Sequence, residues 1–115
     1  MFKCIEERIL NGLINAMGDR QQILANNLTN VNTPGYVRQD LDFGSIFSNL
    51  QKEDSNKSFD KIIEEASFRQ EGSKTSYETE LAEMSKNHLY YVLLTRINGG
   101  YYKTLEEATQ SGRAA

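Results

Sequence analysis

A seam of apolar residues near the start of the chain constrains the fold more than any other feature. Its members are spaced alternately four and three residues apart. They are Leu10, Ile14, Met17, Leu24, Leu28 and Val31, with polar Gln21 at the remaining position. This spacing places side chains along one face of an α-helix and is typical of helices that pack against other helices. It predicts a helix from about residue 2 to residue 30, well above the average length of about 12 residues.

A turn signal follows the seam directly. Thr33-Pro34-Gly35-Tyr36 fits a type II turn, with proline at the second position and glycine supplying a positive φ at the third. The residue before a proline is disfavoured in the helical conformation. We therefore expect the helix to end by Asn32 and the chain to be redirected there.

A second apolar pattern occupies the C-terminal third. Thr75-Ser76-Tyr77-Glu78 has the spacing of a capping box and predicts a helix that begins at Thr75. We expect Gly99-Gly100 to end or kink this helix and residues 112–115 to fray. Its apolar side chains form two stripes. One contains Tyr77, Leu81, Met84, His88 and Tyr91, and the other contains Leu89, Val92, Leu93 and Ile97.

The segment between the two patterns is mostly polar. Residues 36–47 are interpreted as an extended segment held by aromatic side chains, and residues 48–61 as a loop or mobile linker. Residues 62–69 fit either a short helix or a strand.

These patterns predict a mainly α fold, in which long N- and C-terminal amphipathic helices pack as an antiparallel, coiled-coil-like pair. A short extended or irregular middle joins them. The expected divisions of this single domain are residues 1–32, 33–74 and 75–115. Each helix has more apolar surface than one antiparallel partner covers, which favours lateral packing between subunits. A monomeric hairpin or bundle is the alternative that periodicity leaves open.

The candidate helix-packing residues come from both patterns. They are Leu10, Ile14, Met17, Leu24, Leu81, Met84, Leu89, Val92, Leu93 and Ile97. Only 38% of the residues are hydrophobic, which is below the ordinary content of soluble domains. We interpret the low content as a sign of a core shared between chains.

Several function classes are disfavoured. With a net charge of −3 and no basic stripe, the chain is not expected to bind nucleic acid. Its one cysteine, Cys4, and one histidine, His88, offer neither a disulfide nor a thiolate metal site. Cys4 is interpreted as a small buried thiol and His88 as a histidine of the helix interface. We expect no catalytic residue, no metal and no cofactor.

The acidic residues near the start of the second helix resemble an acid–base cluster only superficially. Glu78, Glu80 and Glu83 are expected to be solvated, without a convergent polar partner. No stretch approaches the roughly 18 apolar residues of a membrane-spanning helix, so direct membrane insertion is not expected. Charged residues 6–8 also interrupt any apolar region of a cleaved signal peptide.

Two segments resemble a known family. The string RQQILANNLTNVNTPGY, residues 20–36, strongly resembles the N-terminal signature of flagellar rod, hook and hook-associated proteins. Residues 38–43 (RQDLDF) resemble the proximal-rod subunits in particular. Residues 80–87 (ELAEMSKN), with the following LYY, resemble the family's C-terminal helix. The resemblance is thus to the flagellar basal-body rod protein family.

The resemblance implies a structural subunit of the bacterial flagellar proximal rod, which serves motility and is not an enzyme. It implies helical assembly through terminal helices and unfolded export through the flagellar type III apparatus without a cleaved signal. The implied partners are other rod subunits, the rod-base adaptor and the membrane ring protein, in homo- and hetero-oligomeric contacts where the rod crosses the periplasm. The alternatives are another axial rod subunit and a helical export chaperone or adaptor.

The candidate assembly and turn motif lies in the first matching segment. It comprises Asn26, Asn27, Leu28, Asn30, Val31, Asn32, Thr33, Pro34, Gly35 and Tyr36. Four asparagines within seven residues exceed what capping requires, so we expect hydrogen bonds to neighbouring backbone or to other subunits. Ordinary cap and turn roles are the alternative. Tyr36 is expected to pack beneath the turn.

Overall fold

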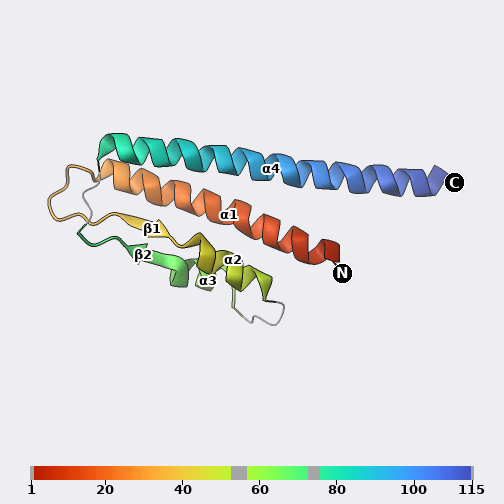
Figure 1. Ribbon diagram of the computed structural model, residues 1–115, viewed down its shortest axis with the longest axis horizontal. Coiled ribbons are helices and arrows are strands. Elements are labelled where there is room, and N and C mark those ends of the chain that lie inside the picture. The colour runs from red at the N-terminus through yellow and green to blue at the C-terminus, as the bar shows by residue number, and fades with distance from the viewer. Residues whose placement is uncertain (1, 53–56, 73–75, 115) are drawn as a thin grey trace.

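Two long helices lie side by side and span most of the molecule's length. The computed structural model describes residues 2–52, 57–72 and 76–114. Helix α1 (Phe2–Thr29) and helix α4 (Tyr77–Ala114) run in opposite directions, and the middle of the chain lies along α1 (Figure 1). The molecule is elongated, with extents of 66 × 30 × 16 Å. The predicted mainly α fold with an antiparallel pair of terminal helices is confirmed.

The predicted turn after α1 is present. The backbone N–H of Tyr36 donates to the carbonyl oxygen of Thr33 at 3.2 Å, which closes the four-residue turn. Gly35 has a φ of 78°, a backbone conformation that other residues rarely adopt. Proline and glycine therefore play the local roles that the sequence predicts, and they lead the chain away from α1.

The start of α4 differs by one residue from the predicted capping box. The Ser76 hydroxyl accepts a hydrogen bond from the backbone N–H of Thr79 at 3.1 Å, so Ser76 caps the helix. Thr75 lies outside the described residues. Glutamates at the second and fourth helical positions complement the positive end of the helix dipole.

The expected break at Gly99-Gly100 is wrong, because α4 continues through both glycines to Ala114. Each glycine costs a helix only about 1 kcal/mol relative to alanine. The helix-favouring residues that follow, such as those of Leu105–Ala108, offset that cost. The expectation of a frayed end from residue 112 is also wrong as far as Ala114.

The middle segment is more regular than predicted, because it contains two short helices. Helix α2 (Phe43–Gln51) begins after Asp42, whose carboxylate accepts from the Ser45 N–H. Helix α3 (Phe59–Ala66) begins after Ser58, whose hydroxyl accepts from the Lys61 N–H. Aspartate and serine are strong N-caps, and this signal was missed when the polar residues were interpreted as an extended segment and a loop.

A small antiparallel sheet is formed by the strands before α2 and after α3. Strand β1 (Gln39–Leu41) pairs with strand β2 (Ser67–Arg69), with Asp40 opposite Phe68. Residues 62–69, which fit either a helix or a strand, thus contain both: the end of α3 and then β2.

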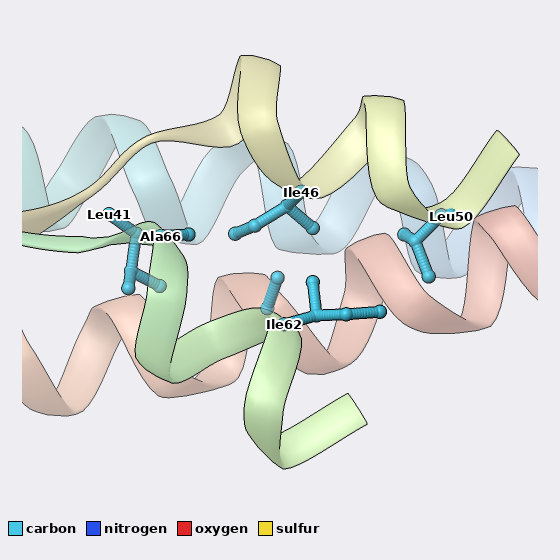
Figure 2. Close-up of a cluster of buried hydrophobic side chains, with 6 residues drawn as sticks. Leu41, Ile46, Leu50, Ile62 and Ala66 are labelled. Atoms are coloured by element: carbon cyan, nitrogen blue, oxygen red, sulfur yellow. The ribbon is translucent and has the colours of Figure 1, made fainter. Parts of the chain in front are cut away.

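The hydrophobic core lies between α1 and the middle segment. Its buried side chains come from α1, β1, α2 and α3, and five of them are labelled in Figure 2. They are Ala16, Leu41, Ile46, Leu50, Ile62 and Ala66. A middle segment poor in apolar residues still supplies all of these side chains except Ala16, whereas its Phe47 and Phe68 are exposed.

The predicted helix-packing residues divide into two groups. In α1, Leu24 is fully buried and Leu10, Ile14 and Met17 are half-buried. In α4, Met84 and Val92 are half-buried, whereas four others are exposed. These are Leu81 (39%), Leu89 (57%), Leu93 (47%) and Ile97 (59%). Packing of the exposed four against other subunits stays a prediction.

Two glycines of α1 provide a matched test of packing. A Cβ atom at Gly12 would lie 2.7 Å from both Cδ atoms of buried Leu50, whereas one at Gly18 would meet nothing within 4 Å. We expect Gly18→Ala to stabilise the chain by about 0.5–1 kcal/mol through helix propensity. Gly12→Ala is expected to destabilise it by about 1 kcal/mol, because crowding outweighs that gain. Urea denaturation of the two variants measures both, and equal stabilisation would contradict the packing of Leu50.

Candidate functional site

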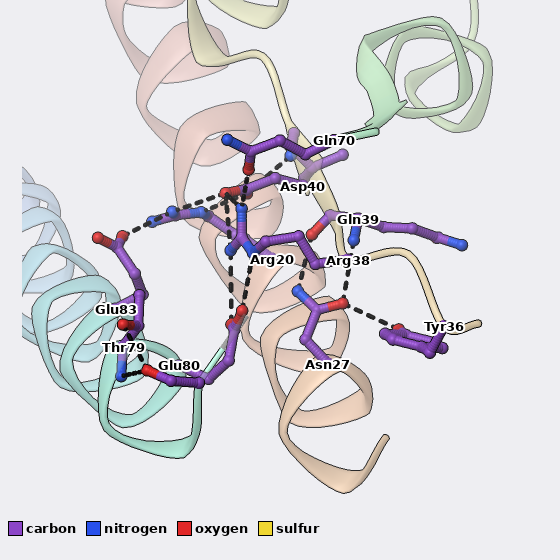
Figure 3. Close-up of polar contacts among 12 residues, drawn as sticks. Arg20, Asn27, Tyr36, Arg38, Gln39, Asp40, Gln70, Thr79, Glu80 and Glu83 are labelled. Atoms are coloured by element: carbon purple, nitrogen blue, oxygen red, sulfur yellow. Dashed lines mark hydrogen bonds and ion pairs between the residues drawn. The ribbon is translucent and has the colours of Figure 1, made fainter. Parts of the chain in front are cut away.

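A cluster of charged side chains joins the first helix, the sheet and the last helix (Figure 3). Arg20 comes from α1, Asp40 from β1, Arg38 from the position just before β1, and Glu80 and Glu83 from the first turns of α4. We call these five residues the buried charge network. Because they come from three distant parts of the sequence, their contacts hold the two terminal helices and the middle segment in one arrangement.

Arg20 links α1 to both other parts. Its Nε and Nη2 atoms donate to the two carboxylate oxygens of Asp40 at 2.7 and 3.1 Å, a bidentate geometry. Nη2 also donates to Glu83 Oε2 at 2.9 Å. The guanidinium carbon lies 5.7 Å from the centre of the Phe43 ring, within the range of a cation–π contact.

Arg38 forms the second link and is the more deeply placed arginine. Its Nε donates to Glu80 Oε1 at 2.7 Å, and its Nη1 donates to Gln70 Oε1 at 2.6 Å. Its Nη atoms also lie 3.4 Å from Asp40 Oδ2. Glu80 is fully buried, and Arg38 and Asp40 are each only 8% exposed. Arg38 therefore neutralises one fully buried carboxylate, that of Glu80, and one largely buried carboxylate, that of Asp40.

The electrostatics of the network favour its charged form. Burial alone would raise the pKa of Asp40, but hydrogen bonds from Arg20 and the Leu41 N–H, with the charges of both arginines, hold that pKa below its ordinary value. The hydrogen bond to Asp40 raises the pKa of Arg20 against the effect of burial. The hydrogen bond to Glu80 does the same for the pKa of Arg38. Paired in this way, Asp40 acts as a structural anion.

The lowered pKa of Asp40 predicts a loss of stability in acid. The unfolded chain has the ordinary aspartate pKa of 3.8 and the folded chain a lower one. The network's contribution is therefore complete above pH 3.8 and is lost as the pH falls through the folded value. We expect the melting temperature to fall more steeply below pH 4 in the natural chain than in Asp40→Asn. Thermal melts between pH 5 and pH 2.5 check this, and parallel curves would contradict it.

Asn27 is the motif residue with the clearest structural role. Its side chain is fully buried, and its Nδ2 donates to the Gln39 carbonyl oxygen at 2.8 Å. Its Oδ1 accepts from the Gln39 N–H at 3.0 Å and from the Tyr36 hydroxyl at 2.9 Å. The amide thus bonds both the N–H and the carbonyl of Gln39, as a neighbouring strand would. These bonds hold the chain after the turn against α1. The expected bonding of the asparagines to neighbouring backbone is found at this position.

The other motif residues have local roles in the single chain. Asn30 Nδ2 donates to the carbonyl oxygen of Asn26 at 2.8 Å, and the Thr33 hydroxyl donates to Asn30 Oδ1 at 3.1 Å. These bonds close the end of α1 in the usual manner of a cap. Asn26 and Asn32 are exposed, so the proposed assembly role of these residues concerns contacts with other molecules and stays a prediction.

Sequence reasoning missed the network, although its residues lie within the segments that carry the family resemblance. The expectation of solvated glutamates is wrong for Glu80, and the side chain of Glu83 is only 34% exposed. The signal available was helical spacing, because Glu80, Glu83 and Asn87 share one face of α4. His88, expected at the helix interface, is exposed in the single chain. The side chain of Cys4 lies outside the described residues.

Other kinds of site have no support in the described part of the chain. Within residues 2–52, 57–72 and 76–114, no group of three or more histidine, cysteine, aspartate or glutamate residues is placed to hold a metal ion. None of the helices described has both the length and the apolar character needed to span a bilayer.

Comparison with known proteins points to one family through the N-terminal segment. No curated protein matches the chain. The profile of the family named "Flagella basal body rod protein" matches residues 13–36, which end at Tyr36 and include Arg20 and Asn27. Over this segment the chain is similar to the flagellar basal body rod protein family.

Proposed function

We propose that this chain is a structural subunit of the proximal part of the rod, the axial drive shaft of the bacterial flagellum. The observation that carries the proposal is the match of residues 13–36 to the rod family. Residues 38–43 further resemble the proximal-rod subunit FlgB, and they contain two residues of the buried charge network. Arg38 and Asp40 thus follow directly after the segment that matches the family.

The structure supports a rod subunit on mechanical grounds. A subunit that transmits torque must keep its terminal helices in a fixed relation to its middle segment. The buried charge network and Asn27 provide that relation, because they bond α1 to β1, and Arg38 just before β1 to α4. The exposed apolar side chains of α4 offer surface for packing against neighbouring subunits, as large exposed apolar patches usually do.

The proposed partners follow from the same position in the rod. They are copies of this chain, the other rod subunits, the rod-base adaptor and the membrane ring protein. The flagellar type III apparatus would export the chain to the basal body, where the rod crosses the periplasm.

The test is to locate the chain in isolated basal bodies. We expect a tagged chain to copurify with rods, density for it near the rod base, and loss of hook and filament when its gene is deleted. Density in the distal rod would instead indicate another axial subunit. A soluble complex with export substrates, together with absence from basal bodies, would indicate a chaperone or adaptor. A normal hook and filament without the gene would overturn the proposal.

A further inference from the structure

One layer of the contact between the two terminal helices is polar on both sides. Gln21 is the polar member of the apolar seam of α1, and Asn87 faces it from α4. Asn87 Nδ2 donates to Gln21 Oε1 at 2.7 Å and to the Met17 carbonyl oxygen at 2.9 Å. Asn87 is fully buried and Gln21 is half-buried. We call Gln21 and Asn87 the polar layer.

The polar layer stabilises the fold less than apolar side chains would at the same positions. Asn87 Oδ1 is buried and has no hydrogen-bond partner among the described residues, and a buried acceptor in this state destabilises the fold. A groove of about 300 Å³ lies beside both residues, so larger apolar side chains would have room. Polar residues at such seam positions in coiled coils lower stability but specify how the helices align.

The face of α4 that carries Asn87 has the same spacing as the seam of α1, with residues alternately four and three apart. Its members are Glu80, Met84, Asn87, Tyr91, Leu94 and Asn98. Alignment at the polar layer of two antiparallel helices places Met17 opposite Tyr91. These two residues do line the same groove. Further along the pair, Asn98 Nδ2 lies 3.4 Å from Asn11 Oδ1, in agreement with the same register.

A different register would separate the two members of the polar layer. A slip of α4 by one heptad, about 10 Å along the axis, would again bring the two equally spaced stripes face to face. It would move Asn87 opposite Ile14 or opposite Leu28, depending on the direction. Both are apolar, so the amide would be buried without the acceptor that Gln21 provides. Apolar layers tolerate such a slip, whereas the polar layer opposes it.

We infer that Gln21 and Asn87 are positioning residues that fix the register of α4 along α1 and lower the stability of the chain in doing so. The buried charge network bonds the first turns of α4, and Asn87 acts two turns beyond Glu80. The inference concerns the single chain, so it stands or fails independently of the rod assignment.

The register determines where the exposed apolar surface of α4 lies. Leu89, Leu93 and Ile97 are between 47% and 59% exposed. A slip by one heptad would carry them about 10 Å along the molecule relative to the middle segment, which packs on α1. A fixed register therefore gives every copy of the chain the same spacing between its middle segment and this surface.

The first test is a thermal melt of the full chain with Gln21→Leu and Asn87→Leu together. We expect this double variant to melt at least about 4 °C higher than the natural chain, because the unpaired buried acceptor is gone and the groove accepts the larger side chains. The control is Gln22→Leu with Lys86→Leu, one position away on exposed sites, which should melt within about 2 °C of the natural chain. A polar-layer variant that melts no higher than the natural chain would overturn the inference.

The second test measures the register by intramolecular disulfides in a Cys4→Ser background. Met17→Cys with Tyr91→Cys reports the natural register. Met17→Cys with Met84→Cys, or with Asn98→Cys, reports a slip of one heptad in either direction. With the polar layer present, each slipped pair should form at least about tenfold less disulfide than the natural pair, because a displacement of about 10 Å exceeds the reach of the bond.

A third set of variants separates the polar layer from the buried charge network. Arg38→Ala, Glu80→Gln and Glu83→Gln together remove the ion pairs that hold α4. In this background we expect the natural disulfide pair to dominate while Gln21 and Asn87 are present. Replacement of both by leucine should raise the slipped pairs at least about fivefold. Equal amounts of slipped product with and without the polar layer would show that it does not set the register. The melting test does not depend on this background and can overturn the inference by itself.

Discussion

Replacement of Arg38 by alanine is expected to lower the free energy of unfolding by about 3–5 kcal/mol, because it leaves buried carboxylates without their cation. Glu80 is fully buried, and Arg38 Nε is 2.7 Å from its Oε1 atom. The same guanidinium bonds Gln70 of the chain after β2, so alanine also frees that side of the sheet. For a chain of this size the loss corresponds to a fall of about 12–20 °C in melting temperature.

The matched control is an arginine of strand β2. Arg69 lies in β2, opposite Gln39 of β1, and is exposed. Arg69→Ala is expected to change stability by less than about 0.5 kcal/mol. Circular dichroism melts of both variants at neutral pH compare the two. An equal effect at the two positions would show that the buried charge network does not hold the helices together.

A double-mutant cycle separates the cost of an unpaired charge from the worth of the pair. If Glu80→Gln accompanies Arg38→Ala, the second substitution removes the anion that the first leaves uncompensated. We expect the double variant to be more stable than Arg38→Ala alone. Removal of both charges of a buried pair destabilises the fold less than removal of one, which leaves the other charge uncompensated. Additive losses would instead place the contribution of Arg38 in its other contacts.

The features that the sequence predicted well are those determined by neighbouring residues. Alternating apolar spacings of four and three residues predict a helix for α1. The Thr33-Pro34-Gly35-Tyr36 turn depends on the fixed φ of Pro34 and on the positive φ that Gly35 adopts. Both are local, and both are present in the structure. The pairing of α1 and α4 was predictable because each has an apolar face that another helix can cover.

The features that the sequence did not predict depend on residues far apart in the chain. Arg38 and Glu80 are 42 positions apart, and no periodic pattern connects an arginine just before a short strand with a glutamate at a helix start. The strands β1 and β2 are three residues each, which is too short for an alternating pattern to be visible. Their pairing is determined by the helices α2 and α3 that fold between them.

The role of Asn27 was predicted only in part from the sequence. The excess of asparagines predicted bonding beyond simple capping, but the four residues look alike in the sequence. Only the tertiary structure separates buried Asn27, which bonds β1, from exposed Asn26 beside it. The register of the chain after the turn decides this, because the turn returns Gln39 to the side of α1.

Replacement of Asn27 by leucine, whose side chain branches at the same atom, should therefore cost about 3 kcal/mol. The substitution leaves the Gln39 N–H, the Gln39 carbonyl and the Tyr36 hydroxyl without their partner. Each buried polar group without a partner costs about 1–3 kcal/mol. Part of that cost is reduced where water reaches Gln39, which is exposed.

Two controls assign this loss to the bonds rather than to the motif as a whole. Asn26→Leu, one position earlier on the exposed side of α1, is expected to change stability by less than about 0.5 kcal/mol. Tyr36→Phe removes only one of the three bonds and should cost about 1 kcal/mol. Chemical denaturation of the three variants measures these differences. If Asn26→Leu destabilised the chain as much as Asn27→Leu, the loss would come from helix propensity. The hydrogen bonds of Asn27 to the chain after the turn would then not explain it.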